Sequence, residues 1–163
     1  MFSGIDFEMY DPSAISGVIN YTGSAFPGCC YTVYVGAFDT TGFDVNNIGD
    51  PDFGTEANWW NEPMYAIGGL DEFLTDGTYY VGAYLDGNNN FTLDPGEPMA
   101  LYGGMTPTPI TVANGSDALD IDITLSDAQM FTVSSWTRPA PDMSERAIAL
   151  RRLAELFRRA QQR

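Results

Sequence analysis

Side chains that could bind a metal ion are concentrated in one twelve-residue stretch, DGNNNFTLDPGE. Oxygen-bearing side chains stand at its positions 1, 3, 5, 7, 9 and 12, and these are Asp86, Asn88, Asn90, Thr92, Asp94 and Glu97. This is the ligand spacing of an EF-hand calcium loop, in which position 7 gives a backbone carbonyl and the Glu at position 12 binds with both oxygens. Calcium takes about six to eight oxygen ligands, which alternate residues of a tight loop can supply. The spacing therefore predicts a calcium site in loop 86–97.

Two features of this stretch depart from the helical motif. Position 6, where that motif has Gly for a sharp turn, is Phe91. The flanking segments, GTYYVGAYL and EPMALYGG, are typical of strands. We therefore expect an EF-type loop that joins two β-strands. The alternative is a hairpin connection with nothing bound, because Asn, Asp and Gly also favour turns. Magnesium fits less well, since it demands a tighter octahedron.

The charge distribution divides the chain into two parts. The sequence has 22 acidic residues, 7 basic residues and no His. All the basic residues are arginines, the first is Arg138, and 19 of the acidic residues precede it. A body of this kind repels nucleic acid and anionic membranes and attracts divalent cations or basic partners. We expect an acidic domain over residues 1–137 and a basic segment over 138–163.

Catalytic chemistry lacks its usual residues. Without His there is no Ser-His-Asp or Cys-His site, and without Lys there is no Schiff base. No glycine-rich phosphate loop occurs, and nothing singles out a pair of carboxylates for glycoside hydrolysis. The sequence predicts that the protein is not an enzyme.

Other residues leave binding alternatives open. Trp59 and Trp60, with Tyr79 and Tyr80, could stack on sugar rings, which would make the domain a carbohydrate-binding module. A second cation site is conceivable in the polar stretch 44–52, at Asp44, Asn46, Asp50 and Asp52.

The two cysteines, Cys29 and Cys30, are adjacent. Successive strand residues point to opposite faces, so we expect one to be buried and one exposed. An intermolecular disulfide through the exposed thiol stays open, whereas two thiols without His make a poor zinc site.

Short apolar segments separated by Gly, Pro, Asn and Asp indicate an all-β fold. Strands are predicted at 14–21, 30–39, 64–70, 77–85, 99–102, 109–112, 118–125 and 130–136, with a long polar loop over 40–62. In the alternating stretch 118–125, Leu119, Ile121, Ile123 and Leu125 should face the core. The fold expected is an antiparallel β-sandwich of seven to eight strands. No stretch is apolar enough to span a membrane.

The block from Gly77 to Pro98, GTYYVGAYLDGNNNFTLDPGEP, carries a resemblance. It is similar to the prealbumin-like or carboxypeptidase-regulatory-like β-sandwich modules of microbial surface proteins, in which such a strand runs into an acidic loop ending in G-E-P. The similarity covers residues 14–126 through ISGVINY, CYTVYVGAF, YAIGGL and DIDITL. The resemblance implies a non-catalytic module that often binds calcium in that loop. Phe91 departs from the Gly common in such loops.

The C-terminal segment has a different character. Arg138 to Pro141 is typical of a stiff linker. Asp142 makes a good N-cap, with Glu145 three residues on as its capping-box partner. From there the sequence predicts an amphipathic helix almost to the end, and its contact residues are expected to be Leu150, Arg151, Arg152, Leu153, Leu156, Phe157, Arg158 and Arg159.

This helix would be marginal alone in water, so we expect it to bury its apolar stripe through residues 142–163. It could pack on its own sandwich, on another copy or a separate acidic protein with an apolar groove, or on an anionic membrane. The acidic body argues against the membrane, and the stiff linker favours a contact in trans. Head-to-tail self-association that does not close into a ring would give a filament.

Taken together, the sequence predicts a calcium-stabilised β-sandwich that serves as a structural or interaction subunit of a surface assembly. A docking tag that recruits the sandwich to a larger shell or membrane is a further alternative. The module type suggests an extracellular or cell-surface location. Residues 1–14 show no basic region followed by an apolar one, so we expect no signal peptide there, and a cytoplasmic location stays open.

Overall fold

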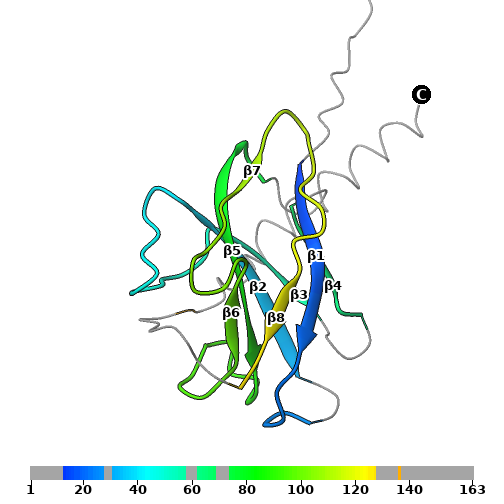
Figure 1. Cartoon of the computed structure of the whole chain (residues 1–163), viewed down its shortest axis with the longest axis vertical. Coiled ribbons are helices and arrows are strands. Elements are labelled where there is room, and N and C mark those ends of the chain that lie inside the picture. The colour runs from blue at the N-terminus through cyan, green and yellow to red at the C-terminus, as the bar shows by residue number, and fades with distance from the viewer. Residues whose placement is uncertain (1–12, 28–30, 58–61, 69–73, 128–135, 137–163) are drawn as a thin grey trace, which may run out of the picture.

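In the part of the chain that the structure describes, the fold is all-β, with eight strands in two sheets (Figure 1). The computed structural model describes residues 13–27, 31–57, 62–68, 74–127 and 136. Its strands are β1 (Ala14–Tyr21), β2 (Thr32–Asp39), β3 (Phe53–Ala57), β4 (Met64–Gly68), β5 (Gly77–Asp86), β6 (Met99–Leu101), β7 (Ile110–Val112) and β8 (Ile123–Leu125).

Several sequence expectations fall outside the described residues. These are the cysteine pair, the tryptophan pair at 59–60, most of the strand expected at 130–136, the linker and the C-terminal helix with its contact residues.

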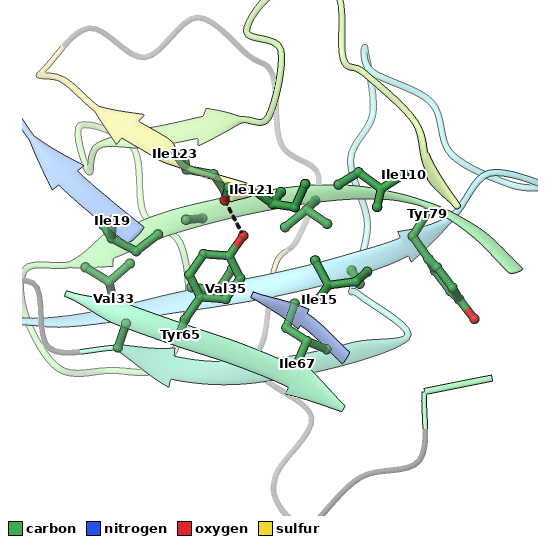
Figure 2. Close-up of a cluster of buried hydrophobic side chains, with 14 of the residues drawn as sticks. Ile15, Ile19, Val33, Val35, Tyr65, Ile67, Tyr79, Ile110, Ile121 and Ile123 are labelled. Atoms are coloured by element: carbon green, nitrogen blue, oxygen red, sulfur yellow. Dashed lines mark hydrogen bonds between the residues drawn. The ribbon is translucent and has the colours of Figure 1, made fainter. Parts of the chain in front are cut away.

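The two sheets share one core, as expected for a β-sandwich. One sheet has the order β4-β1-β8, and the other has the order β3-β2-β5-β6 with β7 also paired to β5. The core between them combines Ile15, Ile19 and Ile67 from the small sheet with Val33, Val35 and other residues of the large one (Figure 2). The coarse prediction of an all-β sandwich is thereby confirmed.

The central strands β2 and β5 are buried on both faces. They pair antiparallel over eight residues, from Thr32↔Asp86 to Asp39↔Tyr79. Their outer face carries a second apolar cluster, made of Tyr34, Phe38, Ile48, Tyr84, Leu93, Met99, Leu101 and Trp136. Burial on both faces explains why these two strands are nearly continuous apolar runs without clean alternation.

The expectation that the sandwich is purely antiparallel is wrong at one pair. Strands β1 and β8, which lie side by side in Figure 1, run parallel with Ile19 opposite Ile123. The chain reaches β8 by a long connection after β7, so nothing forces an antiparallel hairpin there.

The expected inward position of Leu119 is also wrong, because a bulge precedes β8. Ile15 is bridged to Ala118 while Ile19 pairs with Ile123, so five steps on one side match four on the other. The extra residue lies at the bend where Asp120 takes a φ of +60°. The shift changes which face each side chain meets, so Leu119 is 62% exposed, whereas Ile121, Ile123 and Leu125 are buried as predicted.

Strand β3 lies within the stretch expected to be a long loop. Its sequence, FGTEA, contains Gly and Glu and has little intrinsic strand preference. It pairs antiparallel with β2, where Gly36 faces Gly54. Pairing with β2, which is held in the core, thus decides the conformation of β3.

The other strands begin and end within two residues of their predicted bounds, except β8, which follows the bulge.

A buried phenol ties β4 to the bulge. The Tyr65 hydroxyl donates a hydrogen bond to the Ile121 carbonyl, with 2.6 Å between the oxygens (Figure 2). We expect Tyr65→Phe to lower the free energy of unfolding by about 1–3 kcal/mol, because a buried carbonyl loses its donor. Urea denaturation at neutral pH measures this. Tyr80→Phe, which keeps the ring that packs on Phe43, is the matched control and should change stability by less than about 0.5 kcal/mol. Equal effects of the two variants would contradict this role.

The same phenol gives an expected pH dependence. Burial raises the pKa of Tyr65 above its ordinary 10.0, and the charge of Asp122 and the nearby Tyr102 raise it further. The folded state thus favours the neutral phenol, so its contribution to stability is complete below pH 10.0 and is lost as the pH rises above that value. Above pH 10.0, the wild type should therefore lose stability more steeply than Tyr65→Phe.

Candidate metal centre

The candidate loop joins two paired strands, as predicted. Strand β5 ends at Asp86, and β6 begins at Met99, with Tyr84 opposite Met99 in the antiparallel pair. The Leu85 N–H donates to the Pro98 carbonyl at 2.9 Å, which holds the two ends of the loop together. The chain between them must therefore fold back on itself within loop 86–97.

Asp86 organises the first half of the loop. Its side chain has no solvent exposure. One carboxylate oxygen accepts the N–H groups of Asn88 and Asn90 at 3.2 Å each, and the other accepts the N–H of Phe91 at 2.8 Å. The carboxylate thus fixes the turn that follows β5, in the manner of an Asx turn.

Glu97 closes the second half of the loop. Only 5% of this residue is exposed. Its two carboxylate oxygens accept separate N–H groups, from Gly87 at 2.7 Å and from Asp94 at 2.9 Å. Burial raises the pKa of Glu97, the N–H donors of Asp94 and Gly87 lower it, and the charges of Asp86 and Asp94 raise it again. Glu97 therefore binds both ends of the loop to each other.

Asp94 gathers the amide side chains. One of its carboxylate oxygens accepts from the side-chain amides of Asn88 and Asn90, at 2.7 Å each. A half-turn of either amide about its last torsion would exchange nitrogen for oxygen at that point. Thr92 joins the same network through its backbone, donating its N–H to the Asn90 side-chain oxygen at 2.9 Å. The six residues predicted from their spacing thus belong to one hydrogen-bonded loop.

Position 6 makes its turn without glycine. Phe91 has a φ of +65°, in the left-handed region that glycine enters freely and an aromatic residue rarely adopts. Its ring is partly exposed and contacts that of Tyr34, with 6.1 Å between centroids. By residue type, Phe91 is a departure from the motif. The backbone nevertheless bends at this residue in the conformation that the motif's glycine favours.

The candidate ligand set is mixed in chemistry. Within the described residues, no three His, Cys, Asp or Glu side chains group closely enough to form a metal site of those residue types alone. The loop instead combines carboxylates with amide side chains and backbone carbonyls. These are the hard oxygen donors that calcium takes in proteins.

The other candidate residues make hydrogen bonds outside this loop or are buried. In the stretch 44–52, one Asp44 oxygen accepts the backbone and side-chain N–H groups of Asn46 at 2.9 and 3.2 Å. Asp52 accepts the N–H of Asp39, the last residue of β2, at 2.7 Å, so the two carboxylates hold different segments of the chain. Tyr79 is only 2% exposed, which leaves no ring face for a sugar.

Comparisons with known proteins add no assignment. Protein-family models, curated proteins and solved structures were all compared with the chain, and none matches. Among the residues that the structure describes, no helix is long and apolar enough to cross a membrane.

The left-handed turn gives a direct test of the loop geometry. Phe91→Gly and Phe91→Ala both remove the ring, so they differ only in backbone preference. We expect the Gly variant to be more stable by about 1 kcal/mol, because the left-handed conformation costs a residue with Cβ about 1–2 kcal/mol. Urea denaturation in chelator measures the difference. At the exposed Thr124 of β8, the order should reverse, with Ala better than Gly by about 0.5–1 kcal/mol. The same order at both positions would contradict the turn.

Proposed function

We propose that this chain is a non-catalytic calcium-binding β-sandwich module, with calcium held by loop 86–97 between β5 and β6. The ligands would be side-chain oxygens of Asp86, Asn88, Asn90, Asp94 and Glu97 and the backbone carbonyl of Thr92. The module would serve as a structural or interaction subunit.

One observation carries the calcium proposal. Among the described residues, Asp86 and Glu97 are the only buried side chains that carry charge, and they belong to the same loop. No basic residue precedes Arg138, so the acidic domain holds no arginine or lysine that could pair with them. Buried carboxylates are costly unless paired, hydrogen-bonded or bound to a metal. A divalent cation would add positive charge beside these two buried carboxylates.

The hydrogen bonds leave room for coordination. A carboxylate has about four lone-pair sites. Each Glu97 oxygen accepts one N–H of the loop, and in the proposed site both oxygens would bind the ion while keeping these donors. One Asp86 oxygen accepts two N–H groups and the other accepts one, so a site remains for the ion. The N–H contacts of Asp86 and Glu97 would then persist when calcium binds. The Asn88 and Asn90 amides would need to turn, and their oxygens would exchange the N–H groups of Asn90 and Thr92 for the ion.

The assembly role is supported by the charge separation in the sequence. Residues 1–137 carry 19 acidic residues and no basic one, whereas all 7 arginines follow. The predicted helix at 142–163 would therefore find complementary charge on another copy or on an acidic partner. We place such an assembly at a cell surface or outside the cell, and a contact that does not close would extend into a filament.

Calcium should stabilise the folded domain. At free calcium about 100 times the Kd, the free energy of unfolding should rise by about 2.7 kcal/mol over the value in chelator. Isothermal titration calorimetry gives the Kd, and urea denaturation gives the stabilisation. Asp94→Asn and Glu97→Gln should each abolish the effect or weaken binding at least tenfold.

Asp120→Asn is the matched control for this experiment. It removes one negative charge from an exposed residue outside the loop, and its φ of +60° suits Asn. Its calcium affinity should equal that of the wild type. An equal loss of affinity in the control would indicate diffuse attraction by the acidic surface and would contradict a loop site.

The C-terminal segment should be required for association. Sedimentation velocity of the full chain should show species larger than a monomer, whereas a truncation at residue 137 should remain monomeric. Charge reversal of Arg151 and Arg152 to Glu is a milder variant that leaves the chain length unchanged and should also weaken association. If the full chain is monomeric with and without calcium, self-assembly is excluded.

A further inference from the structure

On the outer face of the large sheet, the indole of Trp136 packs against Gly36, Phe38, Gly82 and Tyr84, and we call these four residues the Trp136 seat. Trp136 is 1% exposed, and its ring meets those of Phe38 and Tyr84 nearly edge-on, with centroids 5.0 and 5.1 Å apart. Beneath the indole, Gly36 of β2 pairs with Gly82 of β5. A Cβ atom added at Gly36 would lie 2.6 Å from the Pro51 side chain and 3.0 Å from the indole, and one added at Gly82 would lie 3.2 Å from the indole. The glycine pair therefore leaves the space that the indole fills.

This seat borders the candidate calcium loop directly. The Leu93 N–H donates to the Trp136 carbonyl at 3.0 Å, and Leu93 is buried in the same apolar cluster as the indole. Leu93 stands between Thr92 and Asp94, both of which are proposed ligands. On the other side, Tyr84 contacts the indole and lies two residues before Asp86 on the same strand. Loop and seat thus share a hydrogen bond, an apolar side chain and a strand.

We propose that the Trp136 seat and loop 86–97 form one coupled site, in which calcium binding at the loop strengthens the seating of Trp136. The inference rests on the calcium site of the proposed function and adds its regulation. Trp136 comes two residues before Arg138, where the basic segment begins. Calcium would therefore fix the position of Trp136, a residue close in sequence to the Arg-rich segment, and so influence how that segment is presented to a partner.

The physical reason is the conformational freedom of Leu93. An ion that binds Thr92 and Asp94 holds the residues on both sides of Leu93, so less entropy is lost when its N–H and side chain engage Trp136. The effect must be reciprocal, because a coupling free energy acts equally on both sites. Loosening Trp136 must then weaken calcium binding, although Trp136 is not itself a proposed ligand.

The first test measures calcium affinity by isothermal titration calorimetry on full-length variants. Trp136→Phe keeps an aromatic ring but leaves part of the seat unfilled. Gly82→Ala obstructs the seat, since its Cβ would lie 2.6 Å from the Leu101 side chain and 3.2 Å from the indole. Each should raise the Kd about fivefold or more, in the usual range of coupling between sites. Gly49→Ala, whose Cβ would meet nothing within 4 Å, is the control and should leave the Kd unchanged.

The second test observes the seat itself. The sequence has 3 Trp residues, so Trp59→Phe combined with Trp60→Phe leaves Trp136 as the only indole. Calcium should then reduce acrylamide quenching of its fluorescence at least twofold, and Asp94→Asn should remove that response.

The outcomes separate the two proposals. If the wild type does not bind calcium, the proposed function and this inference both fail. If it binds calcium but Trp136→Phe and Gly82→Ala, shown to be folded by circular dichroism, keep the wild-type Kd within twofold, only the coupling is overturned. Quenching that calcium binding leaves unchanged would likewise overturn the coupling alone.

Discussion

The buried carboxylate of Asp86 is the group on which the candidate loop and its surroundings depend. It ends the longest strand of the sandwich, opposite Thr32 of β2, where two apolar layers have removed the strand from water. A charge at such a place must find donors nearby, and three backbone N–H groups of the following turn supply them. The turn brings the chain back so that Glu97 can close the loop and β6 can pair with β5. The conformation of the polar loop and the packing of the apolar clusters therefore depend on each other.

The same arrangement explains how an acidic loop can affect apolar packing. The side chain of Leu93 packs in the apolar cluster on the outer face of the large sheet. The residues on either side of it, Thr92 and Asp94, carry oxygen ligands of the proposed site. A change in the conformational freedom of the loop should therefore alter the packing of the side chains that cover the outer face of β2 and β5. Trp136 is among them, and it is the described residue nearest in sequence to the basic segment. In the proposed coupling, this is the route by which a cation at the loop would act on the C-terminal segment.

Much of the fold was predictable because local pattern and tertiary burial agree in the central strands. The apolar runs around Val35 and Val81 indicate strands whatever the topology, and the Asp86–Glu97 spacing indicates a loop that follows the second of them. Strand β3 was missed because FGTEA becomes a strand only through its partner β2. The face of Leu119 was missed because one bulged residue reverses the alternation, and a bulge at Asp120 has no strong sequence signal. At Phe91, position 6 of the EF-hand spacing indicates a left-handed turn, whereas an aromatic residue argues against one. The backbone makes the turn that the motif position indicates.

A calcium titration followed by backbone ¹⁵N–¹H NMR of the full chain would locate the cation site residue by residue. If loop 86–97 is the cation site, the amide signals of Gly87, Phe91 and Gly96 should shift first and with a common Kd. The amides of the separate polar stretch 44–52 should stay in place over the same range. Shifts that begin in stretch 44–52, or small shifts spread evenly over the acidic surface, would contradict the account. The buried carboxylates of Asp86 and Glu97 would then have to be explained by their hydrogen bonds alone.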